Sequence, residues 1–137
     1  MVYGTERLIA PVKIDAGGFV LDGDLAVPPG AGGLVIFAHG SGSSRHSRRN
    51  RAVAETLREH GLATLLMDLL TAEEEVIDAQ TAELRFDIGL LSDRVVKAVD
   101  WAGEQGNTRG LKIGLFGAST GAAAALIAAA SRPEAAK

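Results

Sequence analysis

The sequence predicts an α/β fold, with a mostly parallel, twisted sheet, an antiparallel N-terminal hairpin and helices on both faces of the sheet. Three observations support this prediction. Apolar residues alternate with polar ones near the N-terminus, three later runs are continuously apolar, and segments with helical spacing separate those runs. Continuous apolar runs are typical of strands buried on both faces of a parallel sheet. Strands that alternate with helices imply right-handed crossovers, which place helices on both faces.

The first predicted elements form a hairpin. Residues 15–18 (Asp-Ala-Gly-Gly) make the turn, and apolar residues alternate with other residues on both sides of it. The stretch 28–32, rich in proline and glycine, ends the second strand. The alternating residues are Val12 and Ile14 before the turn and Phe19, Leu21, Gly23, Leu25 and Val27 after it.

Strands and helices alternate over the rest of the chain. The predicted strands are residues 34–38, 62–67 and 111–116, and the predicted helices are residues 48–60, 87–104 and 122–130. The first helix stops at Gly61, and the second places Ile88, Leu91 and Val95 at helical spacing. The predicted order is therefore strand, strand, strand, helix, strand, helix, strand, helix.

Composition limits the class of protein. The 137 residues are 47% apolar and only 4% aromatic, so the chain can bury a sizeable aliphatic core. A net charge of −3 predicts no special affinity for nucleic acid. The absence of cysteine excludes a disulfide scaffold, a thiolate metal site and a cysteine nucleophile. The longest apolar stretch is too short to span a bilayer and no signal-peptide pattern opens the sequence, so we expect a cytoplasmic protein without membrane contact.

Residues 117–121 (Gly-Ala-Ser-Thr-Gly) lie between the last predicted strand and the last predicted helix. A strand, a sharp turn carrying one serine and a helix form the setting of a nucleophile elbow. The flanking glycines allow the tight turn, and the N-terminus of the helix faces any oxyanion formed there. Ser119 is therefore the candidate nucleophile. The alternative is a Gly-Ser turn that only joins a buried strand to a buried helix.

The loop after strand 34–38 should lie at the same edge of the sheet as Ser119, because both follow the carboxyl ends of strands. It begins His39, Gly40, Ser41. An oxyanion formed at the serine needs two donors, and the amides of Ser41 and Thr120 are the candidates. His39 could be read as the catalytic base, but we expect His39 and Gly40 to support the loop through hydrogen bonds.

A base for the serine is not found where this architecture supplies it. In hydrolases whose nucleophile lies on an elbow between a strand and a helix, the acid and the histidine follow the serine in the chain. After Ser119 the only ionisable side chains are Arg132, Glu134 and Lys137, and all three histidines precede the serine.

These features together resemble the α/β-hydrolase superfamily and, within it, the dienelactone-hydrolase-like group. The resemblance rests on three blocks in order: residues 37–42 (Phe-Ala-His-Gly-Ser-Gly), 61–68 (Gly-Leu-Ala-Thr-Leu-Leu-Met-Asp) and 114–121 (Gly-Leu-Phe-Gly-Ala-Ser-Thr-Gly). It implies hydrolysis of small-molecule carboxylic esters or lactones through an acyl-serine, without a metal or organic cofactor. It also implies that Ser119 is the nucleophile, with Ser41 and Thr120 at the oxyanion-hole positions.

Members of that family continue through further strands, which deliver the acid and the histidine, whereas this sequence ends at Lys137. We therefore expect residues 1–137 to be a single incomplete α/β-hydrolase domain, truncated after the nucleophile helix. Residues 1–32 would form the hairpin and loop, and residues 33–137 the alternating units. Strand 111–116 would keep an open edge, which invites pairing with another chain. A separate C-terminal polypeptide of the same enzyme, or a second copy in a homo-oligomer, is the expected partner.

Two other function classes stay open. The spacing Gly114, Gly117, Gly121 after a strand could cradle a nucleotide phosphate, although it lacks the dinucleotide spacing. A non-catalytic scaffold derived from a hydrolase would carry the same residues without a completed triad.

Several charged groups have two interpretations. The basic residues of 45–51 could attract an anionic substrate group, but a solvated loop and helix face is the favoured interpretation. Asp68 could be a substitute triad acid, but we expect it to make turn or cap hydrogen bonds, since a carboxylate without a histidine cannot complete the relay. We expect Glu73, Glu74 and Glu75 to form a solvated loop or helix start.

Overall fold

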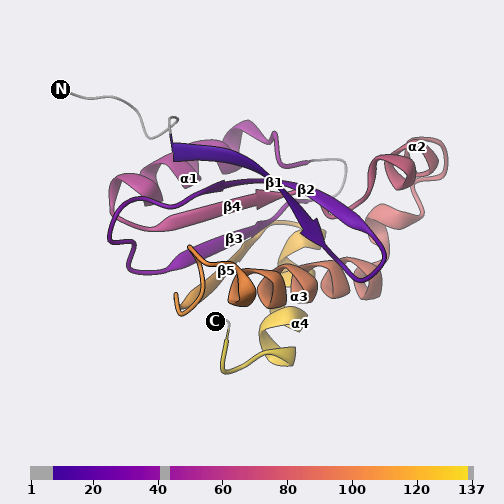
Figure 1. Ribbon diagram of the computed structural model, residues 1–137. Helices are drawn as coiled ribbons and strands as arrows, with labels where there is room; N and C mark the ends of the chain where they lie inside the picture. Colours follow the sequence, from indigo (N-terminus) through magenta and orange to yellow (C-terminus); the bar gives the residue numbers. More distant parts are fainter. Residues whose placement is uncertain (1–7, 41–43, 136–137) are drawn as a thin grey trace.

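The computed structural model describes residues 8–40 and 44–135. Five strands form one sheet in the order β1-β2-β4-β3-β5, and helices cover both of its faces (Figure 1). The strands are β1 (Ile9–Asp15), β2 (Val20–Ala26), β3 (Leu34–Ala38), β4 (Ala63–Met67) and β5 (Ile113–Gly117). The helices are α1 (Arg48–Glu59), α2 (Ala72–Thr81), the 3-10 turn η2 (Leu84–Phe86), α3 (Ile88–Glu104) and α4 (Thr120–Ser131).

The sheet is mixed, as the sequence predicts. Strands β1 and β2 form an antiparallel hairpin, β2 pairs antiparallel with β4, and β4, β3 and β5 run parallel. The hairpin turn contains Gly17 and Gly18, both with positive φ, and the Gly17 amide donates a hydrogen bond to the Asp15 carboxylate over 3.0 Å. Glycine adopts this backbone conformation without a steric penalty, so the turn is encoded locally.

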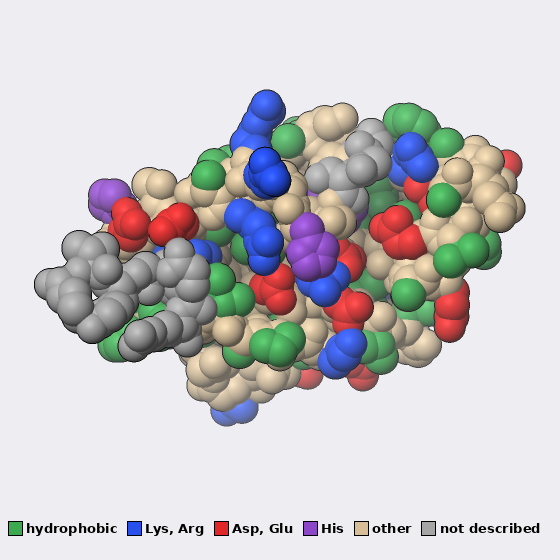
Figure 2. Space-filling view, turned by 90° about the horizontal axis from the view of Figure 1, so that it is seen from above, with side chains coloured by type: hydrophobic (Ala, Val, Ile, Leu, Met, Phe, Trp, Pro, Cys, Tyr) green, Lys and Arg blue, Asp and Glu red, His purple; other side chains and the backbone are tan. Residues whose placement is uncertain are grey.

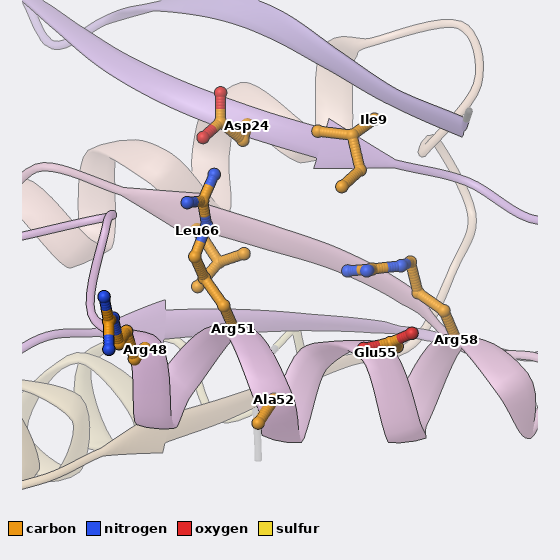
Figure 3. A pocket seen from close by; sticks show the side chains of 8 residues that line it. All are labelled: Ile9, Asp24, Arg48, Arg51, Ala52, Glu55, Arg58 and Leu66. Carbon is orange, nitrogen blue, oxygen red and sulfur yellow. The ribbon is translucent and has the colours of Figure 1, made fainter. Parts of the chain in front are cut away.

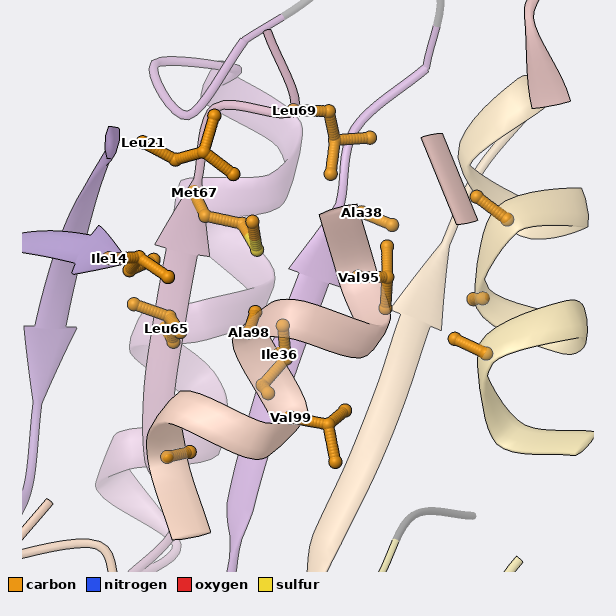
Figure 4. Close-up of a cluster of buried hydrophobic side chains, with 14 of the residues drawn as sticks. Ile14, Leu21, Ile36, Ala38, Leu65, Met67, Leu69, Val95, Ala98 and Val99 are labelled. Atoms are coloured by element: carbon orange, nitrogen blue, oxygen red, sulfur yellow. The ribbon is translucent and has the colours of Figure 1, made fainter. Parts of the chain in front are cut away.

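Two apolar layers hold the sheet to its helices. On one face, side chains of β1, β2, β3 and β4 meet α3 and α4 in a cluster that contains Ile36, Leu65 and Val95 (Figure 4). On the opposite face, Phe37 and Leu66 pack against Ala54 of α1. The Phe37 and Phe116 rings lie 5.0 Å apart between their centroids. The alternate residues of β3 thus face opposite layers, as expected for a strand covered on both sides.

Helix α2 is the one helix that the predicted order lacks. It begins with a capping box, in which Thr71 and Glu74 exchange hydrogen bonds between side chain and backbone, and Asp78 is its buried residue. The other helices begin and end within two residues of the predicted bounds. Over the described ranges 8–40 and 44–135, no helix is both long and apolar enough to cross a membrane.

Strand β5 is the last strand of the sheet and pairs with β3. Its residues from Gly114 onward are half-buried, in contrast to the fully buried β4. Beside it, Leu126 and Ile127 of α4 are 73% and 45% exposed. The apolar edge that the sequence predicts for this strand and this helix is therefore present.

Candidate active site

The carboxyl ends of β3 and β5 bring two loops together. The strands are in parallel register, with Ala38 opposite Gly117, so the residues that follow each strand lie at one edge of the sheet. Gly40 comes so close to the other loop that a Cβ added there would lie 3.2 Å from the Cβ of Ser119. The structure thus places four of the predicted site residues together: His39, Gly40, Ser119 and Thr120. Ser41, the fifth, lies outside the described residues.

Ser119 is exposed and has a φ of 58° and a ψ of −129°. A side-chain-bearing residue in such a conformation costs about 1–3 kcal/mol and persists only where its surroundings enforce it. The neighbouring glycines supply that enforcement. A Cβ at Gly121 would lie 2.1 Å from the Ala38 carbonyl oxygen, and one at Gly117 would lie 2.4 Å from the Gly121 carbonyl oxygen. Only glycine fits at both positions, so strand, turn and helix are pressed together around the serine.

Thr120 is the first residue of α4, so its amide has no acceptor within the helix. That amide and the helix dipole both favour negative charge beside Ser119. Within the described part of the chain, the Thr120 hydroxyl is buried and has no hydrogen-bond partner.

The His39 ring is buried, and both of its nitrogens are engaged. The Leu69 amide donates to Nε2 over 3.0 Å. Nε2 is therefore the acceptor, so Nδ1 carries the proton and donates it to the Gly40 carbonyl oxygen over 2.9 Å. In this arrangement neither nitrogen is available to take a proton from Ser119. The ring instead joins the loop after β3 to the segment after β4.

A buried arginine and its carboxylate partner form an ion pair next to Leu69, the residue whose amide donates to this histidine. Arg94 of α3, only 2% exposed, donates two hydrogen bonds to the Glu74 carboxylate, over 2.7 Å and 2.8 Å, and one to the Leu69 carbonyl oxygen over 3.2 Å. The Phe19 ring covers the guanidinium, with 4.8 Å between the ring centroid and the guanidinium carbon. Arg94 is not among the site residues that the sequence predicts. Its position on the same helix face as Leu91 and Val95 was the available signal, because a charge in an apolar stripe needs a buried partner.

The pKa values of two neighbouring glutamates are shifted in opposite directions. The hydrogen bonds from Arg94 lower the pKa of Glu74 and outweigh the opposing effect of its partial burial. Burial raises the pKa of Glu75, and the nearby Asp68 carboxylate raises it further. Glu73, Glu74 and Glu75 do form a helix start, as expected, but Glu74 is a partner of a buried cation rather than a solvated residue.

Arg45 differs from the other basic residues of 45–51. Its amide donates to Asp68 over 2.9 Å, and its guanidinium pairs with Asp68 and with Asp24. These bonds fasten the loop after β3 to the sheet edge. Asp68 makes hydrogen bonds, but to a residue 23 positions away rather than within a turn or at a helix cap, as the sequence had suggested. The interpretation of the cluster as a solvated face is wrong for Arg45 and correct for the exposed Arg48 and Arg51.

A groove runs beside α1. It encloses about 430 Å³, and arginines of α1 line it together with carboxylates (Figure 3). The charged lining residues are Asp24, Arg48, Arg51, Glu55 and Arg58. Positive and negative side chains are likewise interspersed over the face shown in Figure 2.

Among residues 8–40 and 44–135, no group of three His, Cys, Asp or Glu side chains could hold a metal ion.

Comparison with known proteins gives two kinds of relative. A dienelactone hydrolase from Anabaena variabilis superimposes with a TM-score of 0.93 and is 58% identical, covering 94% of this chain and 60% of that one. Est1E from Butyrivibrio proteoclasticus is 25% identical with a TM-score of 0.75, covering 93% of this chain and 48% of that one. No family model matches.

The second kind comes from Mycobacterium tuberculosis. Two curated proteins, each called "putative phosphoribosyl transferase", are 54% identical to this chain over 119 residues, which is 87% of this chain and 26% of each relative. The chain therefore spans about a quarter of the length of the curated relatives that it matches.

Proposed function

This chain belongs to the α/β-hydrolase superfamily, in its dienelactone-hydrolase-like group, and we propose that it carries the nucleophile of a serine hydrolase that acts on carboxylic esters or lactones. The single observation that supports this proposal best is the strained, exposed Ser119 at a strand-to-helix turn, with Gly40 beside it. A turn with no other role than joining β5 to α4 has no use for this strain.

In the proposed reaction, the Ser119 hydroxyl attacks the ester or lactone carbonyl carbon and loses its proton to a base. The carbonyl oxygen becomes an oxyanion, which the amides of Thr120 and Ser41 stabilise. Collapse of this intermediate breaks the bond to the alcohol oxygen, which takes the proton and leaves an acyl-serine. Water then adds to the acyl carbon, and the acid is released as Ser119 regains its proton. His39 and Gly40 hold the oxyanion loop in place.

We propose that the base and its acid come from a C-terminal segment of the same enzyme or from a second polypeptide. Both nitrogens of His39 are occupied, so this histidine, which precedes the Gly40 that lies beside Ser119, is not free to act as the base. The edge of β5 and the exposed Leu126 and Ile127 mark where such a segment would pack. Cover for this surface, from the segment or from a second copy, would bury apolar area and pair the open strand.

The alternatives have weaker support. In a phosphate cradle, the free faces of the glycines point toward the ligand. Here the free faces of Gly117 and Gly121 point at backbone atoms of the chain itself, so these glycines serve packing. The same observation gives no support to phosphoribosyl transfer by this part of the chain, although its Mycobacterium tuberculosis relatives carry that name. A non-catalytic scaffold would share every contact described and would differ only in lacking the base.

Labelling with a fluorophosphonate tests the proposal, because the reagent reacts only with an activated serine. The complete enzyme, carrying the segment that supplies the histidine, should be labelled, and Ser119→Ala should abolish labelling. Ser131→Ala, at the other end of α4, is the matched control and should leave labelling unchanged. Native and denaturing mass measurements on the same sample identify any second polypeptide. A correctly folded, complete protein that resists the label would refute the serine mechanism.

A further inference from the structure

We propose that Arg94, held by Glu74, is a positioning residue for the oxyanion loop and that it acts through Leu69 and His39. This inference rests on the proposed function, because it concerns the loop that faces Ser119. It adds two residues, one from α2 and one from α3, that neither the sequence motifs nor the family resemblance assigns to the site.

The first step is the fixed position of the cation. The Arg94 guanidinium is buried, makes two hydrogen bonds to one carboxylate and lies under the Phe19 ring. A bidentate pair between arginine and carboxylate has a narrow geometry, which a lysine cannot reproduce. The lowered pKa of Glu74 keeps this carboxylate ionised and paired through the pH range in which an unperturbed glutamate takes up a proton.

The second step is the transfer of this position to Leu69. Leu69 is completely buried, and its carbonyl oxygen accepts a hydrogen bond from Arg94 while its amide donates to His39 Nε2. The peptide groups on both sides of the Leu69 Cα are therefore tied, one to α3 and one to the histidine. A shift of the arginine would turn these peptide groups and move the donor that orients the ring.

The third step reaches the loop itself. His39 Nδ1 donates to the Gly40 carbonyl oxygen, and Gly40 is in close contact with the Ser119 turn. The hydrogen bond fixes the Gly40 carbonyl group. A fixed Gly40 holds the start of the oxyanion loop against the turn that carries the proposed nucleophile.

Stability alone does not explain this arrangement. A buried ion pair gives little net stability, and apolar side chains of similar volume often serve as well or better. Leu91, Val95 and Ala98 show that this face of α3 is otherwise apolar. The charge at position 94 is explained by its hydrogen bond to the Leu69 carbonyl oxygen, which no apolar side chain could make.

Steady-state kinetics of Arg94→Met and Arg94→Lys in the complete enzyme test the inference. Oxyanion contacts strengthen in the transition state, so kcat should fall on the order of tenfold or more while KM changes little. Affinity for a trifluoromethyl ketone inhibitor, which forms an oxyanion on the serine, should fall in parallel. Arg85→Met is the matched control, because Arg85 pairs with Asp78 and does not contact Leu69; it should leave kcat unchanged. Unchanged kcat in a folded Arg94→Met enzyme would overturn the inference.

A second readout separates this inference from the proposed function. Nitrogen NMR of the His39 ring reports its tautomer and its Nδ1 proton whether or not the enzyme turns over substrate. The proton should become more exposed to exchange in Arg94→Lys and stay protected in Arg85→Met. An unchanged His39 signal in Arg94→Lys would refute the positional link even in an active enzyme. If the serine of the wild-type enzyme cannot be labelled and the His39 proton still loses its protection in Arg94→Lys, the proposed hydrolase function is refuted. The positional link from Arg94 to His39 then remains supported.

Discussion

Ser119 and the two glycines around it show how a reactive position is encoded. The glycines at 117 and 121 remove the side chains that would separate β5 from α4, and the serine then has to adopt a positive φ. These residues could be predicted from the sequence, because the pattern of the turn follows from its sterics. Arg94 and Arg45 could not, because each depends on partners that are distant in the chain: Glu74 for the first, Asp24 and Asp68 for the second.

Strain at Ser119 gives a prediction about stability. Ser119→Gly should raise the free energy of unfolding by roughly 1 kcal/mol, because glycine relieves a strain that slightly exceeds its own entropic cost. Activity and labelling should disappear in the same variant. Urea unfolding checks this, with Ser119→Ala as the control: alanine keeps the strained backbone and should gain no stability. Equal stability of the glycine and alanine variants would show that the positive φ carries no cost.

Close packing gives a second prediction at this scale. Gly121→Ala should destabilise the fold by about 3 kcal/mol or more, because its Cβ would overlap the Ala38 carbonyl oxygen. Gly103→Ala, in α3, is the matched control: a Cβ there meets nothing within 4 Å, and alanine should stabilise the helix by about 0.5–1 kcal/mol. Thermal unfolding of both variants measures the contrast, and similar melting temperatures would contradict it.

At the scale of elements, the sequence predicted the strands and helices that have a clear apolar period or a continuous apolar run. The hairpin and the three parallel strands have strong periods or continuous apolar runs. The bounds of β2, β3, β4 and β5 agree with the structure to within two residues, whereas β1 begins at Ile9, three residues before the predicted Val12. Helix α2 lacks such a signal, since Val76 and Ile77 are 64% and 54% exposed and Asp78 is its buried residue. It is defined by its capping box and by polar contacts, which apolar periodicity does not detect.

The contact between α2 and α3 should make stability depend on pH. The pKa of Glu74 is lowered in the fold from its usual 4.5. The unfolded chain therefore binds the proton more tightly, so the contribution of Glu74 is complete above pH 4.5 and is lost as the pH falls through the lower, folded value. Denaturant unfolding between pH 3 and 6 should show this slope in the wild type and a smaller slope in Glu74→Gln.

Glu75 provides the contrast for that measurement. Its pKa is raised, chiefly by burial and then by the Asp68 carboxylate, so its charged form opposes folding. Glu75→Gln should therefore increase stability at neutral pH and steepen the remaining acid-dependent slope. Identical pH profiles for Glu74→Gln and Glu75→Gln would contradict the assignment of opposite shifts.

At the scale of the whole molecule, the two edge strands of the sheet differ in their neighbours. Strand β1 ends one side as part of a hairpin, whereas β5 ends the other beside an apolar helix surface. The sequence predicted the open edge of β5 through the apolar character of residues 111–116 and 122–130. The identity of a covering segment could not be predicted in the same way, because apolar character indicates that a surface expects cover and not which residues supply it.

Association at that open edge can be measured. Ile127→Asp should weaken binding of the proposed C-terminal segment roughly tenfold or more, because it places a charge on the apolar surface of α4. Val76→Asp on α2 is the matched control and should leave binding unchanged, since α2 lies away from β5 (Figure 1). Titration of separately prepared segments, followed by fluorophosphonate labelling, measures both. Equal affinities for the two variants would place the contact elsewhere.

The contact between Gly121 and the backbone of Ala38 and His39 has a consequence for engineering. It acts as a fixed joint between β3 and α4, so a loop from another enzyme cannot be transplanted at an arbitrary junction. A graft that starts after Gly40 and stops before Arg45 keeps the joint, the His39 bonds and the Asp68 anchor. Such a graft changes only the span between these contacts, and the residue placed at position 41 should not be proline, because the proposed oxyanion hole uses its amide.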